Sequence, residues 1–221
     1  MRRILTLAAA ALFWAATALF AQEGKAGLTK EVFYLMPDMA YGTIQFNDKA
    51  PARGDMNICA VDNSIRYMEH GTELSVELDD SIVSVTIGNV LFVPYEGVFL
   101  RIYPFGDAAG VAVRRNVVLL TDGKMASFGM ESNTTAVSSI VSFNTGFHNI
   151  SLEESLDIPY RLNETAFLYR DGNVMTLTKR NLTRCFPNAK ADIEAWFSEH
   201  KKLSQDDVQK VLELCREWSE K

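Results

Sequence analysis

The side chains of this sequence that could do chemistry are three cysteines, three histidines and a few adjacent carboxylates. The histidines, His70, His148 and His200, fall in an expected turn, a polar stretch and the end of an expected helix. Acid–base catalysis and metal binding both need several such groups to converge. The sequence also lacks nucleophile-elbow, zinc-protease and phosphate-loop motifs. We therefore predict no catalytic residue, no metal site and no cofactor.

Cys185 and Cys215 bracket two helix-like runs, which makes them the pair best suited to covalent chemistry. Two thiolates alone do not form a zinc site, and a redox pair usually has C-x-x-C spacing. A structural disulfide suits a secreted protein, but Cys215 also occupies an apolar helix position where a thiol packs as a small hydrophobe. The sequence leaves both a Cys185–Cys215 disulfide and two buried thiols open. Cys59 is the odd cysteine and is expected in a buried strand.

Two C-terminal helices must position these cysteines. Apolar side chains recur at helical spacing over residues 189–200 and again over 208–218. We expect Asn188 to cap the first helix and Ser204 to cap the second, with Asp207 at its third position. Because the connection is short, the helices should run antiparallel and bring the two cysteines close together.

The middle of the chain has the period-two alternation that is typical of β-strands. The alternating stretches are 41–46, 64–67, 73–78 and 82–88, with a further strand at 110–120 and a hairpin formed by 166–169 and 174–178 around Asp171-Gly172. Turn signals separate the strands, among them His70-Gly71 and the A-P-A-R-G-D run at 50–55. Val83, Val85 and Ile87 are expected to face the core. The predicted fold class is α+β: mainly an antiparallel β meander, barrel- or sandwich-like, with a C-terminal helical hairpin.

Residues 89–106 are almost continuously apolar, with a hairpin turn expected at 95–97. Such a run favours a strand that is covered on both faces, and the alternative is an aromatic binding surface. The candidate binding residues are Phe92, Tyr95, Phe99 and Tyr103. On the strand that follows, Arg114 and Arg115 are expected in solvent.

The N-terminus has the layout of a secretory signal peptide, with Arg2 and Arg3 before an uncharged apolar run and a small residue at Ala21. The expected organisation is a signal peptide at 1–21, a β-rich body at 22–130, a flexible Ser/Thr-rich segment at 131–146, and a β-hairpin with C-terminal helices at 147–221. No later apolar run is long enough to span a membrane. We therefore expect a secreted or periplasmic protein without a membrane span after cleavage.

Net charge limits the class of partner. The whole chain carries −6, and removal of the two leader arginines leaves 20 basic and 28 acidic side chains, a net charge of −8. An acidic protein is repelled by nucleic acid phosphates, so nucleic acid is not an expected partner.

Several short motifs also recur in small secreted proteins of the Bacteroidetes. They are Tyr34-Leu-Met-Pro37, Gly42-Thr-Ile-Gln-Phe46, Met56-Asn57, the segment Val85 to Phe92, Phe167-Leu-Tyr169 and Phe186-Pro187. The chain resembles this group over nearly its whole mature length, although Met39 stands where the group has an aromatic residue. The resemblance implies a secreted protein with a β-meander body and two amphipathic C-terminal helices, and it brings no catalytic residues. Asp80-Ser-Ile82 matches the short O-glycosylation pattern of secreted proteins of this phylum, which makes Ser81 a candidate for modification.

Two classes of function agree with these observations. The first is a non-enzymatic module that binds a protein or a cell-envelope component. The alternative is a hydrolase-type enzyme whose site is assembled from scattered carboxylates. A pocket with converging Asp, Glu or His side chains would favour the enzyme, and a shallow apolar site would favour the module.

Overall fold

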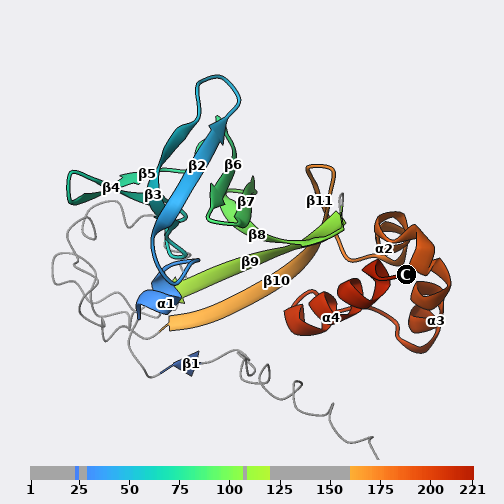
Figure 1. Ribbon diagram of the computed structural model, residues 1–221. Helices are drawn as coiled ribbons and strands as arrows, with labels where there is room; N and C mark the ends of the chain where they lie inside the picture. The colour runs from blue at the N-terminus through green and yellow to red at the C-terminus, as the bar shows by residue number, and fades with distance from the viewer. Residues whose placement is uncertain (1–22, 25–28, 107–108, 120–159) are drawn as a thin grey trace, which may run out of the picture.

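The computed structural model describes residues 23–24, 29–106, 109–119 and 160–221. These residues form one antiparallel sheet of eleven strands and a group of C-terminal helices (Figure 1). The expected leader 1–21 and the expected flexible segment 131–146 lie outside the described residues, as do the expected domain boundaries at 130 and 147.

The strands follow one another in the sheet largely as they do in the chain. Their bounds are β1 Glu23–Gly24, β2 Ala40–Phe46, β3 Ala52–Ile58, β4 Ile65–Glu69, β5 Thr72–Val76, β6 Ile82–Ile87, β7 Val90–Tyr95, β8 Val98–Phe105, β9 Ala109–Leu119, β10 Tyr160–Arg170 and β11 Asn173–Met175. The order in the sheet is β1-β10-β9-β8-β7-β6-β2-β3-β4-β5, and β11 pairs with β10. The predicted antiparallel α+β meander is therefore confirmed. The sheet is open and does not close into a barrel, since β1 and β5 form its two ends.

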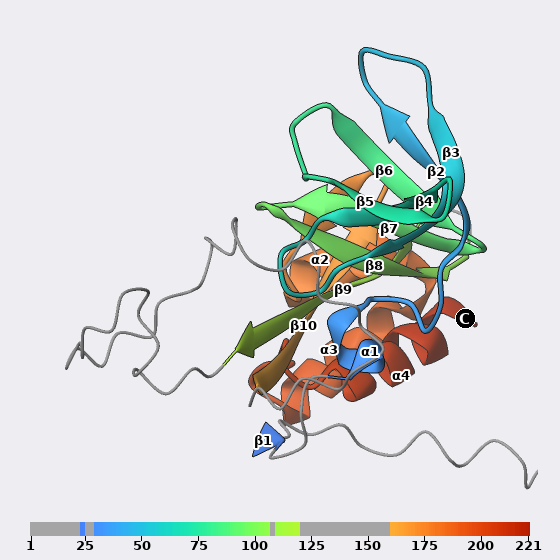
Figure 2. The ribbon, with the colours of Figure 1, turned by 90° about the vertical axis from the view of Figure 1, so that its left-hand side faces the viewer.

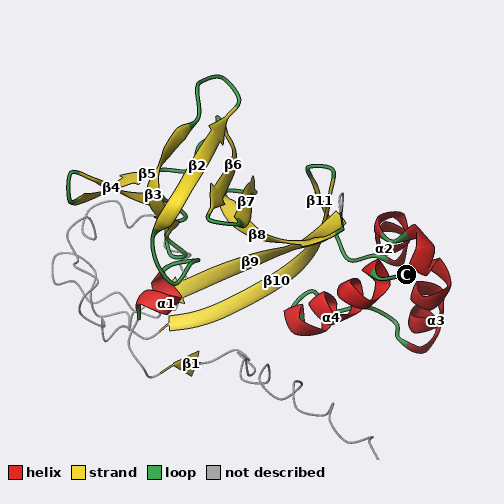
Figure 3. Ribbon diagram, viewed as in Figure 1, coloured by secondary structure: helices red, strands yellow, loops and turns green. Residues whose placement is uncertain are grey.

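The helices are α1 Lys30–Phe33, α2 Lys179–Cys185, α3 Lys190–Glu199 and α4 Val208–Ser219, with a 3₁₀ turn η1 at Pro187–Ala189. Figure 3 shows that all except α1 gather at one end of the sheet. We call α2, η1, α3 and α4 the helical unit. Within it α2 packs on α3, while α4 contacts β8, β9 and β10.

Alternation along β8 divides the apolar side chains between the two faces of the sheet. On one face Phe99 belongs to a core under the curled strands β2–β7, and Tyr103 belongs to a second core under the helical unit. On the other face Leu100 and Ile102 form a third, smaller cluster with Val93 and Ala112. Figure 2 shows the curled strands above and α3 and α4 below the long strands β8–β10.

The expected hairpin turns are confirmed by backbone conformation. Asp171 and Gly172 both have positive φ, at 50° and 81°, as do His70 and Gly71 and the pair Glu96-Gly97. Two central residues with positive φ match the right-handed twist of the flanking strands. Each hairpin therefore places its two strands in register through its turn.

Two predictions for the strands were wrong. The turn expected at 50–55 extends too far: residues 50–51 lie in the connection after β2, whereas residues 52–58 form β3 between β2 and β4 and bury Met56 and Ile58. Val83 does not face the core: it is 49% exposed, while Ile82 is buried. The cause is a register shift in the β2–β6 pairing at Phe46, which puts Ile82 rather than Val83 inward.

Both predicted helix caps were also wrong. Helix α4 begins at Val208, and Asp207 is itself the N-cap, with its carboxylate accepting a hydrogen bond from the Lys210 amide. Asn188 lies inside η1, and α3 follows from Ala189 without a side-chain cap. Both helices begin later in the chain than the sequence pattern predicts, so the capping acceptor of α4 is Asp207 rather than Ser204.

Candidate functional site

Charged side chains converge beneath α1, where Tyr34 packs against the β4–β5 hairpin. The Tyr34 hydroxyl donates to both oxygens of Glu73, at 3.2 and 3.1 Å. Arg66 Nη2 lies 2.5 Å from Asp62 Oδ2, and Arg66 Nη1 lies 3.9 Å from Glu73 Oε1. Tyr34 directly follows α1, Asp62 lies in the β3–β4 loop, and the turn at His70-Gly71 brings Arg66 of β4 near Glu73 of β5. We call these four residues the Tyr34 cluster.

The electrostatics of this cluster favour ion pairs. Burial alone would raise the pKa of Asp62, but hydrogen bonds from the Ser64 hydroxyl and amide, together with Arg66, hold it below its usual value. Burial likewise opposes the charge of Arg66, yet Asp62 and the other neighbours raise its pKa. Burial and the Glu73 charge raise the pKa of Tyr34. At neutral pH, Asp62 and Arg66 are therefore charged and the Tyr34 hydroxyl is protonated.

The Tyr34 cluster has no free acid–base pair. Asp62 is occupied by Ser64 and Arg66, and Glu73 by Tyr34 and Arg66. Beside it, Cys59 is fully buried, and burial followed by the Asp62 charge raises its pKa to about 12. The arrangement fastens α1 to the β4–β5 hairpin and supplies no group that could activate a water molecule.

The four candidate binding residues do not form one surface. Phe92 and Phe99 are 0% and 1% exposed and belong to the core under the curled strands. Tyr95 and Tyr103 are half-buried on opposite faces of the sheet, in the third cluster and at the edge of the helical core. The favoured core assignment therefore holds for two of the four aromatic residues.

Tyr95 instead belongs to an aromatic bridge on the face that carries the third cluster. Its ring lies 5.7 Å from the ring of Phe167, although β8 and β9 separate the strands that carry them. Neighbouring strands are about 4.8 Å apart, so the two rings meet only because this face is concave. Arg114 lies over Phe167 at 5.6 Å and pairs with Glu96 at 2.9 Å, so it is not simply solvated. Arg115 likewise pairs with Glu164, on the other face.

Cys185 and Cys215 do come together in the core of the helical unit. The structure has both thiols free and buried, as it has Cys59. Burial raises the pKa of Cys215 to about 12, and the neighbouring Cys185 contributes to that rise. Both cysteines therefore belong to one core, and the structure has no bond between them.

The most site-like feature of the described residues is a cleft of about 240 Å³ where the helical unit meets the ends of β8–β10. Its apolar lining includes Phe105, Phe186 and Trp218, together with Cys185. The rings of Phe186 and Trp218 are 6.5 Å apart with an interplanar angle of 50°. The polar lining consists of Arg170, Lys221, Asn188 and Ser219. We call this feature the junction cleft.

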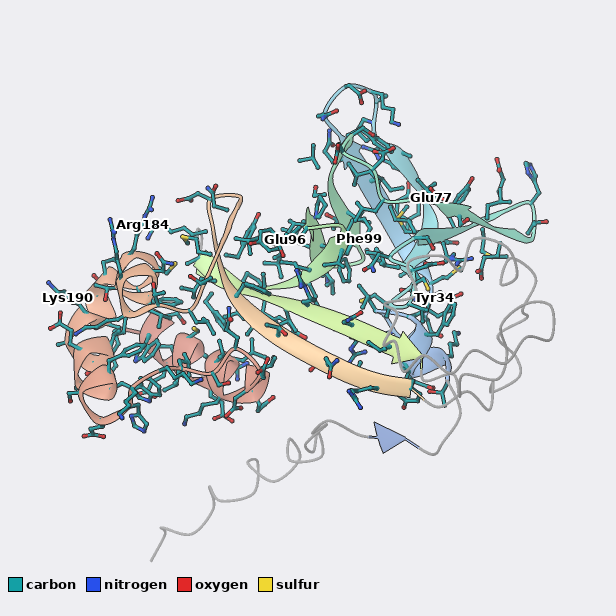
Figure 4. All side chains as sticks on the ribbon, turned by 180° about the vertical axis from the view of Figure 1, so that it is seen from behind. Tyr34, Glu77, Glu96, Phe99, Arg184 and Lys190 are labelled. Carbon is teal, nitrogen blue, oxygen red and sulfur yellow. The ribbon has the colours of Figure 1, made fainter. Side chains whose placement is uncertain are left out.

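Charged groups of both signs lie around the junction cleft, since Arg170 pairs with Asp171 at 3.2 Å and Lys221 with Asp192 at 3.8 Å. Burial raises the pKa of Cys185, while the charges of Arg170 and Arg184 oppose that rise. Helix α2 carries Lys179, Arg180 and Arg184 and no acidic residue. Figure 4 shows Arg184 at this end of the molecule, opposite Tyr34. Helix α2 therefore adds positive charge at this end of a chain whose net charge is −6.

Sequence reasoning missed the junction cleft because its lining residues are spread from Phe105 to Lys221 over strands, helices and connecting segments. The available signals were the aromatic residues just before Pro187 and at Trp218, next to a run of basic side chains. Those signals predicted packing of the helices, which is confirmed, but not a recess between them.

The remaining candidate groups are isolated. His70 is in a turn, His148 lies outside the described residues, and His200 stacks on Trp196 at 4.3 Å between ring centroids. Among the described residues, no group of three or more His, Cys, Asp or Glu side chains could hold a metal ion. None of the described helices is long and apolar enough to cross a bilayer.

Comparisons with protein-family models, with curated proteins and with solved structures find no match for this chain.

Proposed function

We propose that this protein is a non-enzymatic secreted or periplasmic module that binds a protein or an envelope component through the junction cleft. The observation that carries the proposal is the lining of the cleft, which combines three aromatic residues, Phe105, Phe186 and Trp218, with the two basic residues Arg170 and Lys221. Aromatic walls with a few charged groups at the rim are typical of recognition sites.

The lining argues against catalysis at the junction cleft. Burial raises the pKa of the Cys185 thiol, the Ser219 hydroxyl donates to the Arg216 carbonyl, and Lys221 Nζ lies 3.8 Å from Asp192. A thiol needs a lowered pKa or an adjacent base to act as a nucleophile at neutral pH. Elsewhere, the carboxylates of Asp62 and Glu73 are engaged in ion pairs and hydrogen bonds. The hydrolase alternative therefore has no observation in its favour.

The proposed location rests on the leader-like residues 1–21 and on the resemblance to small secreted Bacteroidetes proteins. In an oxidising compartment the nearby thiols of Cys185 and Cys215 would be joined, and we retain that disulfide as part of the proposal. Peptide mapping of non-reduced protein from the native envelope should find a Cys185–Cys215 link. Recovery of both as free thiols there would contradict it.

The test of binding is a pull-down with crosslinking from the native envelope, using protein altered in the junction cleft. Asn188 is exposed and lines the cleft, so Asn188→Trp should fill it without disturbing a core. The control is Asn173→Trp, which places the same side chain at an exposed position of β11 that does not line the cleft. We expect the wild-type protein and the Asn173 variant to capture the same component and the Asn188 variant to lose it. Equal capture by all three would refute binding through this cleft.

A further inference from the structure

We infer that the open edge of β5 is a docking site for an extended segment of a protein partner in which basic and apolar side chains alternate. Strand β5, Thr72–Val76, is the last strand of the sheet, at the opposite end from β1 and β10. The bound segment pairs with β5 through its main chain and extends the sheet by one strand. This site is separate from the junction cleft, so the inference does not depend on the proposed function.

Two residues of β5 present main-chain donors and acceptors that face away from β4. The hairpin turn His70-Gly71 has two residues, so Glu69 and Thr72 form a hydrogen-bonded pair. Such pairs alternate with non-hydrogen-bonded pairs along an antiparallel ladder, which turns the amide and carbonyl groups of Glu73 and Ser75 outward. Among the described residues, no strand pairs with this side of β5 and no main-chain group bonds to it.

The two ends of the sheet differ in how they are covered. At the other end, β1 and β11 pair with parts of β10, and the Gln205 carbonyl accepts a hydrogen bond from the Ala166 amide between them. Proteins usually protect a free edge with proline, lysine or a bulge. Strand β5, with the sequence T-E-L-S-V, has none of these and pairs with β4 without a register shift. Its edge can therefore accept a further strand.

The two faces of β5 call for different side chains on that further strand. Leu74 is 36% exposed and lies opposite Tyr67, on the face that packs towards the core under the curled strands. Glu73 points to the other face, where it meets Tyr34, and Glu77 continues the alternation just after β5. Directly paired residues of neighbouring strands lie about 4.5–5.5 Å apart between Cβ atoms. We therefore expect an apolar side chain beside Leu74 and a cationic one near Glu77.

Strand β5 is held in place before a partner binds. The carboxylate of Glu73 accepts hydrogen bonds from the Tyr34 hydroxyl at 3.2 and 3.1 Å and lies 3.9 Å from Arg66 Nη1. These contacts hold the side chain against the face that carries α1, so it does not cover the outward main chain. A strand that is already ordered loses less conformational entropy when a partner pairs with it.

Charge around this edge favours a basic segment and opposes a second copy of the chain. Residues 62–81 include one basic side chain, Arg66, which is buried and already paired. The same residues include six acidic side chains: Asp62, Glu69, Glu73, Glu77, Asp79 and Asp80. Figure 4 shows Glu77 at the same end of the molecule as Tyr34, away from Arg184. Two copies paired through β5 would bring like charges together, whereas lysine or arginine is attracted.

The test uses the full mature chain and a seven-residue probe of alternating lysine and valine, with both ends blocked. A counterpart with glutamate in place of lysine is the matched control. Amide hydrogen exchange is followed by NMR. In the free protein, the outward amides of Glu73 and Ser75 should exchange faster than those of Leu74 and Val76, which bond to β4. Saturating lysine probe should slow both outward amides at least about ten-fold, and the glutamate probe should not.

Variants assign the effect to the edge and to its charge. Ser75→Pro removes an outward amide without removing a bond to β4, so it should abolish the protection of Glu73. If that variant unfolds, Glu77→Lys keeps the main chain and should weaken binding of the lysine probe at least about three-fold, whereas Glu194→Gln on α3 should leave it unchanged.

Three results would overturn the inference. The first is the absence of protection at a saturating concentration of the lysine probe, and the second is equal protection by the two probes. The third is protection of Glu73 and Ser75 without any probe that rises with protein concentration, because that result would assign the edge to a second copy of the chain.

Discussion

Arg66 carries its positive charge into a part of the sheet where only 7% of its side chain meets solvent. A buried ion is stable only when partners replace its hydration, and Asp62 is the nearer of the two that do so. The Nε atom of Arg66 has no hydrogen-bond partner among the described residues. Removal of one carboxylate partner would therefore leave the guanidinium buried with few polar contacts.

Asp62→Ala should therefore destabilise the protein by about 2 kcal/mol, less than a fully buried pair would give because Asp62 itself is 37% exposed. The matched control is Asp38→Ala, whose partner Lys30 is 47% exposed and which should cost less than about 1 kcal/mol. Urea unfolding midpoints measure both. A similar cost for the two variants would contradict the assignment of a special role to Arg66.

The carboxylate of Asp62 should make the free energy of unfolding decrease at acidic pH. The pKa of Asp62 is lower in the folded protein than its ordinary value, so its contribution is fully present above about pH 4. That contribution is lost as the pH falls through the lower, folded-state pKa. Thermal midpoints of the wild type from pH 6 to pH 2 should fall more steeply than those of Asp62→Asn. Parallel curves would exclude Asp62 as a source of the acid sensitivity.

The thiols should differ in reactivity when the protein is kept reduced. Burial raises the pKa values of Cys59 and Cys215 to about 12, and both residues are 0% exposed. Cys185 is 6% exposed and lines the junction cleft, so iodoacetamide at pH 8 should label it first. Mass spectrometry of the peptides gives the order. Labelling of Cys215 as fast as Cys185 in the folded protein would contradict the packing of α4.

At the scale of elements, the sequence predicted most strands because their alternation and turn pairs are local properties. It expected a strand around Cys59 but missed the first part of β3, because Pro51 and Gly54 are turn-forming residues that pairing with β2 and β4 overrides. It placed Val83 on the wrong face because a bulge is fixed by the partner strand and leaves no mark in the alternation itself.

Two glycines that face each other across β2 and β3 give a sharp test of sheet packing. A Cβ at Gly42 would lie 2.6 Å from the Thr86 carbonyl oxygen, whereas one at Gly54 would meet nothing within 4 Å. Gly42→Ala should destabilise the protein by about 1–3 kcal/mol, as overpacking does. Gly54→Ala should change the stability by less than about 0.5 kcal/mol. Denaturant titration compares the two, and equal effects would show that β2 and β6 are not as close as described.

At the scale of the whole molecule, the strands β8, β9 and β10 connect the apolar clusters. The core under the curled strands and the core of the helical unit both include side chains from β9 and β10. Damage to one core should therefore weaken the other, and the described residues should unfold as one cooperative unit.

The two tryptophans of the described residues, Trp196 and Trp218, both lie in the helical unit, while circular dichroism reports largely on the sheet. Their urea transitions should coincide. Ile58→Ala in one core and Leu182→Ala in the other should each shift both transitions together by about 2–5 kcal/mol. Fluorescence that changes before the circular dichroism would indicate a helical unit that unfolds independently.

The candidate site is the part that the sequence predicted least. Phe105, Arg170 and Trp218 belong to three elements, and only the docking of α4 against the sheet brings them to one recess. Period and spacing describe single elements, so a site that depends on the contact between elements leaves no pattern in the chain. The sequence shows only that aromatic and basic residues lie near each other in the C-terminal segment.

The hydrogen bond from the Ala166 amide to the Gln205 carbonyl, at 2.8 Å, has a consequence for biosynthesis. It occupies a main-chain donor on the outer side of β10, between the short stretches where β1 and β11 pair with that strand. Gln205 follows Ala166 by 39 residues, so β10 leaves the ribosome or the translocation channel well before this cover does. During that interval the strand is an open template for pairing with other nascent chains, and a holding chaperone would have its greatest effect there.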